Sequence, residues 1–358
     1  MKISILHNKN FSPNEICFLY PLVKYKKILK VEFGITLDFI NNINKISSDI
    51  IILSSRWFSD IWLTQGVSHI LKLLNRVKSN TSKVIWYDIS DSTGTTHFML
   101  LPYVDLYLKN QIFSNKQNYL NKYYGSRIYS DFIYNKFQIQ DSNEGDDHLN
   151  FIPEQCLLHK IKCGWNSGIS YFGDKRHIQN YLFSKNPYIL KLFKNKWVSP
   201  GSQKSIPVSC RLGTNYSRQT ISESRHIILR QLNDLLPIAK ISHKSYYKEL
   251  KQSIAAVSPF GLGEISLRDF EVTINGAAMI KQDMSHLETW PNLWIKDKTY
   301  LDFKWDMSDI REKVEFAIEN TDIMRELAHN AQSTYKEILD SKDSAQIFCE
   351  RFKELIEG

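Results

Sequence analysis

The stretch SPFGLGEISLRDFE combines, at helical spacing, residue types that bind charged groups. It follows an apolar run and precedes the apolar segment AAMIK. On a helix over 264–275, Glu264, Arg268, Glu271 and Asn275 fall within a stripe about 60° wide between apolar flanks. Charges on a buried helix are costly unless they are paired. The pattern therefore predicts either acid–base pairs that satisfy one another or a polar surface that binds a ligand.

The glycines of FGLG, Gly261 and Gly263, predict a tight turn just before this helix. Such a turn lets the backbone N–H groups at the start of a helix approach an anion. The order of strand, glycine turn, charged helix and strand favours the ligand-binding interpretation.

A second group of titratable residues lies in the first half, in WYDISDSTGTTHF. Asp88, Asp91 and His97 follow a predicted strand at its carboxyl end, where α/β sheets bind their ligands. Asp91 or His97 is suited to take a proton from a hydroxyl group. The same residue types are also typical of turns and helix caps, and that alternative stays open. The D-x-x-D spacing of Asp88 and Asp91 is a weak match to a metal site, and we expect no metal.

Alternating apolar and helical segments must position these residues. Strands are predicted at KISILH, SDIIILSS, KVIWYDIS and PYVDLYLKN, and then at 206–210, 238–241, 254–258, AAMIK and 300–303. Helical patterns separate the later strands and fill the chain from Asp309 onward. This alternation predicts α/β architecture with two Rossmann-like domains that face a cleft, followed by C-terminal helices. We place the domains at 1–200 and 201–358.

Composition is that of a globular protein: 358 residues, 42% hydrophobic and 23% charged, with five scattered cysteines. The unpaired cysteine count, the absence of a signal-peptide pattern and the lack of a long apolar run favour a cytoplasmic protein. The net charge of +8 favours an anionic partner, although dispersed surface lysines are an equally good explanation.

The segment PFGLGEISLRDFEVTINGAAMI resembles the donor-binding segment of GT-B glycosyltransferases, including the family 1-like members. Its RDFEVTING run is similar to the exostosin-type pattern, and DMSHLETWPN resembles a segment of bacterial enzymes from surface-polysaccharide clusters. Retaining members of this fold have two glutamates eight positions apart. Here Glu271 matches the second, whereas Gly263 stands at the first position and Glu264 follows it.

The resemblance implies an enzyme that moves a sugar from a nucleotide-sugar donor to a glycan or lipid-linked acceptor, without a metal or another cofactor. Residues 1–200 would form the acceptor side and 201–358 the donor side. The loop RLGTNYSRQ would face the donor diphosphate with Arg211 or Arg218, or be an ordinary basic loop. Trp290 would stack on a ring or anchor its loop. The donor-binding residues implied are Arg211, Arg218, Gly261, Gly263, Glu264, Arg268, Glu271 and His286, with Asp91 or His97 as the catalytic base.

Two other functions fit parts of the pattern. Two α/β halves around a cleft also describe nucleotide-sugar epimerases and isomerases. A basic nucleic-acid-binding protein is disfavoured, because no helix-turn-helix, RNP, KH or zinc signature is present and the lysines are dispersed. We therefore expect no nucleic-acid partner, and we expect the basic surface to favour peripheral contact with the anionic inner face of the cell membrane.

Overall fold

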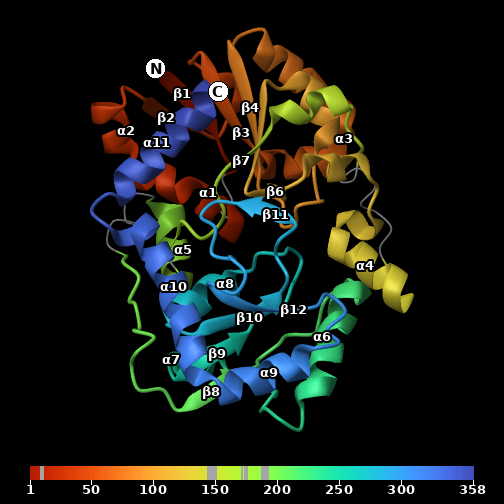
Figure 1. Cartoon of the computed structure of the whole chain (residues 1–358). Coiled ribbons are helices and arrows are strands. Elements are labelled where there is room, and N and C mark those ends of the chain that lie inside the picture. Colours follow the sequence, from red (N-terminus) through yellow and green to blue (C-terminus); the bar gives the residue numbers. More distant parts are fainter. Residues whose placement is uncertain (9–11, 143–150, 171, 173–175, 187–192) are drawn as a thin grey trace.

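The structure is a computed structural model with two parallel β-sheets, one above the other in Figure 1, each flanked by helices. The fold class expected from the sequence, two Rossmann-like α/β domains facing a cleft, is confirmed. The structure describes residues 1–8, 12–142, 151–170, 172, 176–186 and 193–358.

The first sheet has six parallel strands in the described part of the chain, in the order β2-β1-β3-β4-β5-β7. The strand β3 (Ile50–Ser54) is buried along its whole length, as expected for a strand with helices on both faces. The other strands are β1 (Lys2–Leu6), β2 (Thr36–Ile40), β4 (Lys83–Asp88), β5 (Leu106–Lys109) and β7 (Ile161–Cys163). The helices of this half are α1 (Pro13–Lys24), α2 (Lys26–Glu32), α3 (Ser59–Lys78), α4 (Ile128–Phe137) and α5 (Arg176–Lys185).

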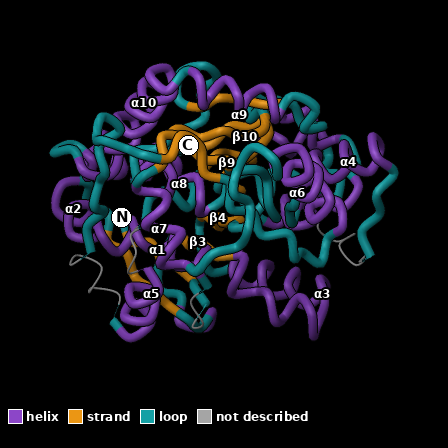
Figure 2. Tube along the Cα trace, turned by 90° about the horizontal axis from the view of Figure 1, so that it is seen from below, coloured by secondary structure: helices purple, strands orange, loops and turns teal. Residues whose placement is uncertain are grey.

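The second sheet has four parallel strands in the order β12-β10-β9-β8. Its strands are β8 (Ile206–Ser209), β9 (Ser253–Val257), β10 (Ala278–Gln282) and β12 (Tyr300–Phe303). Its helices are α6 (Gln219–Leu232), α7 (His243–Lys251), α8 (Leu267–Ile274), α9 (Ile310–Glu319) and α10 (Thr321–Asp340). Seen from below in Figure 2, α8 and α9 lie on opposite sides of β9 and β10. Accordingly Ala256 packs into one core cluster while Ala255 and Val257 pack into the other.

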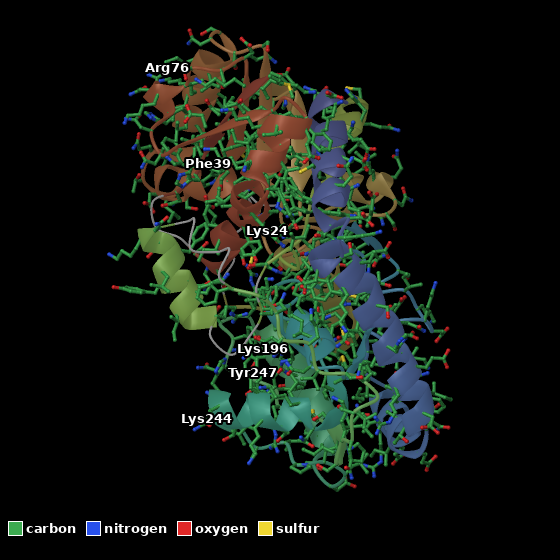
Figure 3. The ribbon with its side chains drawn as sticks, turned by 90° about the vertical axis from the view of Figure 1, so that its left-hand side faces the viewer. Lys24, Phe39, Arg76, Lys196, Lys244 and Tyr247 are labelled. Atoms are coloured by element: carbon green, nitrogen blue, oxygen red, sulfur yellow. The ribbon has the colours of Figure 1, made fainter. Side chains whose placement is uncertain are left out.

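Two features join the domains. The short strands β6 (Gln111–Phe113) and β11 (Leu287–Thr289), one from each half, pair in an antiparallel ladder. The last helix, α11 (Ser344–Glu357), returns to the first domain, and Figure 3 shows α10 and α11 following one another along one side of both domains. Lys83 Nζ in β4 donates to the carbonyl of Ile356 in α11 at 2.7 Å.

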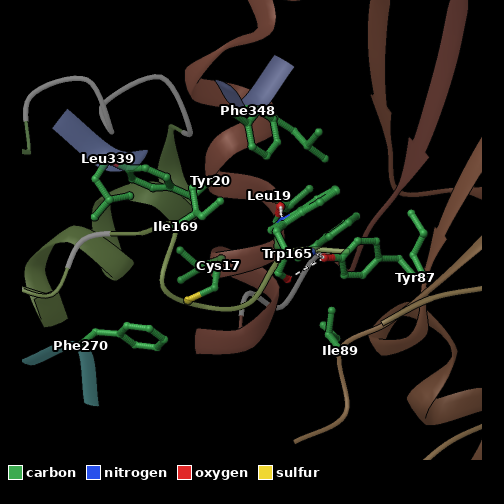
Figure 4. Close-up of a cluster of buried hydrophobic side chains, with 14 of the residues drawn as sticks. Cys17, Leu19, Tyr20, Tyr87, Ile89, Trp165, Ile169, Phe270, Leu339 and Phe348 are labelled. Atoms are coloured by element: carbon green, nitrogen blue, oxygen red, sulfur yellow. Dashed lines mark hydrogen bonds between the residues drawn. The ribbon is translucent and has the colours of Figure 1, made fainter. Parts of the chain in front are cut away.

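An aromatic cluster fills the space under α11. Figure 4 shows Trp165 between Tyr87 of β4 and Phe348 of α11. The rings of Trp165 and Tyr87 lie 4.5 Å apart, those of Trp165 and Phe348 lie 5.5 Å apart, and the Tyr87 hydroxyl donates to the Trp165 carbonyl at 2.7 Å. Phe270 of α8 lies in the same cluster, which therefore joins elements of both halves.

Some sequence predictions of elements were wrong. Residues 238–241 form no strand, and the helix predicted over 264–275 spans only Leu267–Ile274. The C-terminal helices were predicted to belong to the second domain, but the last of them, α11, packs on the first domain. The boundary near residue 200 stays a prediction.

Candidate functional site

Three cavities with shared walls extend from the first domain to the second. The central cavity has a volume of about 500 Å³, the side cavity in the first domain about 330 Å³ and the C-terminal cavity about 460 Å³. Arg56 and Asp91 line both the central and the side cavity, and Leu267 lines both the central and the C-terminal cavity. Asp91 thus stands where the central and side cavities meet. The start of α8 stands where the central and C-terminal cavities meet.

Asp91 is held by one contact to its side chain and one to its backbone, from two different elements. It lies just beyond the carboxyl end of β4, and Asn14 Nδ2 of α1 donates to its Oδ1 at 2.7 Å. The Gln111 side chain donates to the Asp91 backbone carbonyl. Among the described residues, Asp91 Oδ2 has no protein donor, so one carboxylate oxygen is left for a ligand. This geometry suits the base role predicted for Asp91, which stays a prediction.

His97 lines the side cavity and has a buried carboxylate behind it. Its Nδ1 lies 3.5 Å from Asp88 Oδ1, while Asp88 Oδ2 accepts from Tyr107 Oη at 2.6 Å and from Lys109 Nζ at 3.3 Å. Burial alone would raise the pKa of Asp88, but Lys109 and His97 outweigh it and hold that pKa well below its usual range. Asp88 is therefore an ionised partner that orients its neighbours. Among the described residues there is no group of three or more His, Cys, Asp and Glu placed to hold a metal.

The FGLG loop docks onto the first domain. The carbonyl of Gly261 accepts from Tyr129 Oη at 2.7 Å, and the carbonyl of Leu262 accepts from Arg127 Nε at 2.8 Å. A Cβ at Gly263 would lie 1.9 Å from the Asp91 carbonyl oxygen, so only glycine fits this approach. Gly261 and Gly263 do line the central cavity. Their clearest role is to bring the start of α8 against the Asp91 loop.

Glu264 is not part of the polar stripe predicted for it, because the helix begins three residues later. It is fully buried, accepts from Thr93 N–H and from Gln111 Nε2, both at 3.1 Å, and also accepts from the Thr93 hydroxyl. Burial would raise its pKa, but His286 and Thr93 outweigh burial and lower it. Glu264 is absent from the walls of the three cavities. In this structure Glu264 ties the second domain to the first, and its predicted donor-binding role stays a prediction.

His286 belongs to the same junction. Its Nε2 lies 3.6 Å from Glu264 Oε1, and its ring packs 4.8 Å from the ring of Trp305. The neighbouring Trp290 ring lies 5.0 Å under the guanidinium of Arg351 in α11, which agrees with the loop-anchor interpretation. Neither His286 nor Trp290 is among the residues that line the three cavities.

The start of α8 has its own cap. The N–H of Ser266 donates to Asp269 Oδ2 at 2.9 Å, forming a capping box, and Asp269 pairs with Lys281 Nζ at 3.1 Å. Some of the backbone N–H groups at the start of α8 therefore already have acceptors within the protein and are not left for an anion.

Glu271, Arg268 and Arg211 line the C-terminal cavity together, as the sequence suggested. Glu271 Oε1 accepts from Tyr247 Oη at 2.8 Å and lies 3.4 Å from Arg176 Nη1. Arg268 lies over the ring of Tyr246 at 5.7 Å. Arg211 is held by Glu249, with Nη2 to Oε2 at 2.8 Å, so most of its charge is already neutralised within the protein.

Two arginines line the central cavity, Arg56 and Arg225, and neither was predicted from the sequence. Arg225 is the one that comes from the second half of the chain. Its guanidinium donates to the carbonyls of Phe260 and Gly213 and lies 4.8 Å from the ring of Tyr216. Burial lowers its pKa to about 10, which leaves it charged at neutral pH. Arg218 instead stands at the residue before α6 and pairs with Asp141 at 3.4 Å, and it does not line any of the three cavities. No spacing signal separates Arg225 from other arginines on α6.

Comparisons with known proteins give low similarity. No protein-family profile matches the chain, and no curated protein matches it. Anabaena HepE in complex with UDP-glucose is 11% identical, with a TM-score of 0.44 and coverage of 100% of this chain and 99% of that chain. An alpha-glucosyltransferase in complex with UDP is 11% identical, with a TM-score of 0.45 and coverage of 99% of this chain and 100% of that chain. TarM is 10% identical, with a TM-score of 0.41 and coverage of 86% of this chain and 54% of that chain.

Likeness at this level carries no conclusion about activity. In the described residues, no helix is long and apolar enough to cross a membrane.

Proposed function

We propose that this protein is a glycosyltransferase of the GT-B type, which transfers a sugar from a nucleotide-sugar donor to an acceptor hydroxyl. The observation that carries the proposal is the position of Asp91 at the junction of the central and side cavities, with α8 at the junction of the central and C-terminal cavities. The donor nucleoside, the transferred sugar and the acceptor can then occupy the C-terminal, central and side cavities, respectively. The Asp91 carboxylate would lie between the sugar and the acceptor.

The chemistry follows from this arrangement. The bond between the anomeric carbon and the donor diphosphate breaks, and the acceptor oxygen forms the new bond to that carbon. The acceptor proton passes to the Asp91 carboxylate, which Asn14 orients, or to His97 in the side cavity. The diphosphate leaves as an anion, and Arg225 is the buried cation that stabilises it.

The nucleoside is assigned to the C-terminal cavity. Glu271 would accept hydrogen bonds from ribose or sugar hydroxyls, since its carboxylate lines this cavity and is oriented by Tyr247 and Arg176. Arg268 would contribute positive charge nearby, whereas Arg211 is already paired with Glu249. We propose that no metal is required, because Arg225 and Arg268 supply the charge that a metal would otherwise provide.

The biological setting is also proposed from the sequence. The resemblance of DMSHLETWPN and the net charge of +8 support a glycan or lipid-linked acceptor of bacterial surface-polysaccharide synthesis, with cytoplasmic enzyme at the inner membrane face.

The test begins with thermal shift of the purified protein against UDP, GDP, CMP, ADP and dTDP, with and without Mg²⁺. A ligand at about 100 times its dissociation constant stabilises a protein by roughly 2.7 kcal/mol, a visible shift. The nucleotide sugar of the best nucleotide is then used to measure nucleotide release with a panel of glycans.

Asp91→Asn should abolish acceptor-dependent release and keep the nucleotide shift, whereas Asp322→Asn on the exposed side of α10 should change neither. Stabilisation by none of the nucleotides, or full transfer by Asp91→Asn, would contradict the proposal.

A further inference from the structure

The side cavity has a charge pattern that the transfer reaction alone does not explain. Arg56 and Arg127 both line it, while Asp91 is its only carboxylate among the described residues. Within the same part of the chain, neither guanidinium has a carboxylate within 4.0 Å. Two cations of this kind beside one acid leave the cavity with net positive charge.

Arg56 is placed there by the end of a strand. It lies two residues after β3, and its backbone carbonyl accepts from Asn8 Nδ2 at 2.8 Å. This bond fixes the main chain, while no described residue forms a hydrogen bond with the guanidinium. The acid behind it is Glu15 of α1, whose carboxylate accepts from Ser54 Oγ at 2.7 Å and from Asn8 N–H at 2.9 Å. Burial raises the pKa of Glu15 to about 7, so it neutralises Arg56 only in part.

Arg127 is held rigidly, and no carboxylate of the described residues pairs with it. Its Nε donates to the carbonyl of Leu262 and its Nη1 to the carbonyl of Gly125, both at 2.8 Å. Carbonyl groups orient a guanidinium without cancelling its charge, so the Arg127 side chain is a fixed cation in the wall.

The rim of the side cavity is aromatic and apolar. Trp62 is half-buried, and Leu63 is 83% exposed, both at the start of α3. A sugar ring packs well on such an aromatic surface, while its substituents face the polar floor.

Resting on the proposed function, we propose that the acceptor carries an anionic group, a phosphate or a carboxylate, which binds Arg56 and Arg127 in the side cavity next to the hydroxyl that Asp91 deprotonates. Guanidinium groups bind either anion through paired hydrogen bonds, so both belong to the same recognition chemistry. A neutral sugar would leave both cations without a partner, which is costly in a partly dry cavity.

The test is binding of matched sugars by titration calorimetry with the intact protein. The probes are glucose, galactose and mannose, each compared with its 6-phosphate and its uronic acid. Titrations are made without nucleotide, and again with the nucleotide that gives the largest thermal shift, which occupies the donor site and keeps the phosphate out of it. The variants are Arg56→Gln, Arg56→Lys and the control Arg76→Gln, whose side chain is on the exposed part of α3 at the upper end of Figure 3.

We expect at least one anionic sugar to bind tighter than its neutral counterpart, by about tenfold or more. Arg56→Gln should lose that difference, Arg56→Lys should keep part of it, and Arg76→Gln should keep all of it. The inference is overturned if no anionic probe is preferred, or if Arg56→Gln and Arg76→Gln bind alike. Failure of the transferase proposal would appear separately, as missing nucleotide binding with the sugar preference intact.

Discussion

Replacing Glu264 with alanine is expected to weaken the junction between the domains while leaving the cavity walls unchanged. The carboxylate is fully buried and is the acceptor for Thr93 N–H and Gln111 Nε2. Each buried donor left without a partner costs about 1–3 kcal/mol, and removal of one member of a buried ionic contact costs about 3–5 kcal/mol. We therefore expect a loss of roughly 4 kcal/mol, or a fall in melting temperature of roughly 8 °C at about 2 °C per kcal/mol.

The measurement is thermal and urea unfolding of Glu264→Ala beside Glu288→Ala. Glu288 lies on β11 of the same junction but is exposed, so its truncation should change the unfolding free energy by no more than about 0.5 kcal/mol. The pH dependence gives an independent check. Because the folded protein lowers the pKa of Glu264 from 4.5, its stabilisation is present above that pH and is lost as the pH falls below it.

Two results would refute this reasoning. If Glu264→Ala melts like Glu288→Ala, the buried carboxylate does not hold the domains together. If it melts normally but no longer gains stability from nucleotide, Glu264 binds the donor as the helical pattern suggested.

Three further perturbations test separate parts of the structure. Glu271→Ala should remove the nucleotide-induced thermal shift, and an unchanged shift would contradict the ribose-binding role. It should also lower the melting temperature without nucleotide, because Tyr247 Oη loses its buried acceptor and Arg176 loses its carboxylate. Burial raises the pKa of Glu15 to about 7, so its ionisation is harder in the folded than in the unfolded protein. The free energy of unfolding should therefore fall by about 3 kcal/mol as the pH rises from about 4.5 to 7. Urea unfolding should therefore find Glu15→Gln more stable than the parent at pH 8 but not at pH 5, and parallel pH curves would contradict this. Gly263→Ala must displace Asp91 and should cost about 1–3 kcal/mol in urea unfolding, unlike Gly213→Ala, whose new Cβ meets nothing within 4 Å; equal midpoints would contradict the close approach.

Long buried strands made the fold class readable from the sequence. Apolar runs such as IIILS and SIAAV, separated by helical periods, leave few alternatives to parallel sheets covered by helices. The strands β6, β7 and β11 were missed because three residues carry no measurable periodicity. The five-residue strand β2, TLDFI, was also missed, because only two of its residues are buried and it is not a continuous apolar run. Their existence depends on partners elsewhere in the chain, as with β6 and β11, which come from different halves.

The site was predictable where local order decides it and not where the two halves meet. Glu271 and Arg268 follow from the spacing on one helix, and Asp91 follows from the end of a strand. The position of Glu264 was not predictable in the same way, because the helix starts only at Leu267, where Ser266 and Asp269 form the cap. Arg225 was missed because only the tertiary fold decides which arginine of α6 reaches the cavity.

The return of α11 determines how this chain could be recombined with relatives. By position in the sequence α11 follows the second domain, but its Phe348 and Phe352 cover the aromatic surface around Trp165 in the first. A chimera joined only near residue 200 would pair one protein's α11 with another protein's Trp165 surface, and mismatched apolar faces of this kind promote aggregation. An exchange of the second sheet and its helices should therefore transplant residues 201–343 and leave 344–358 with the domain on which α11 folds.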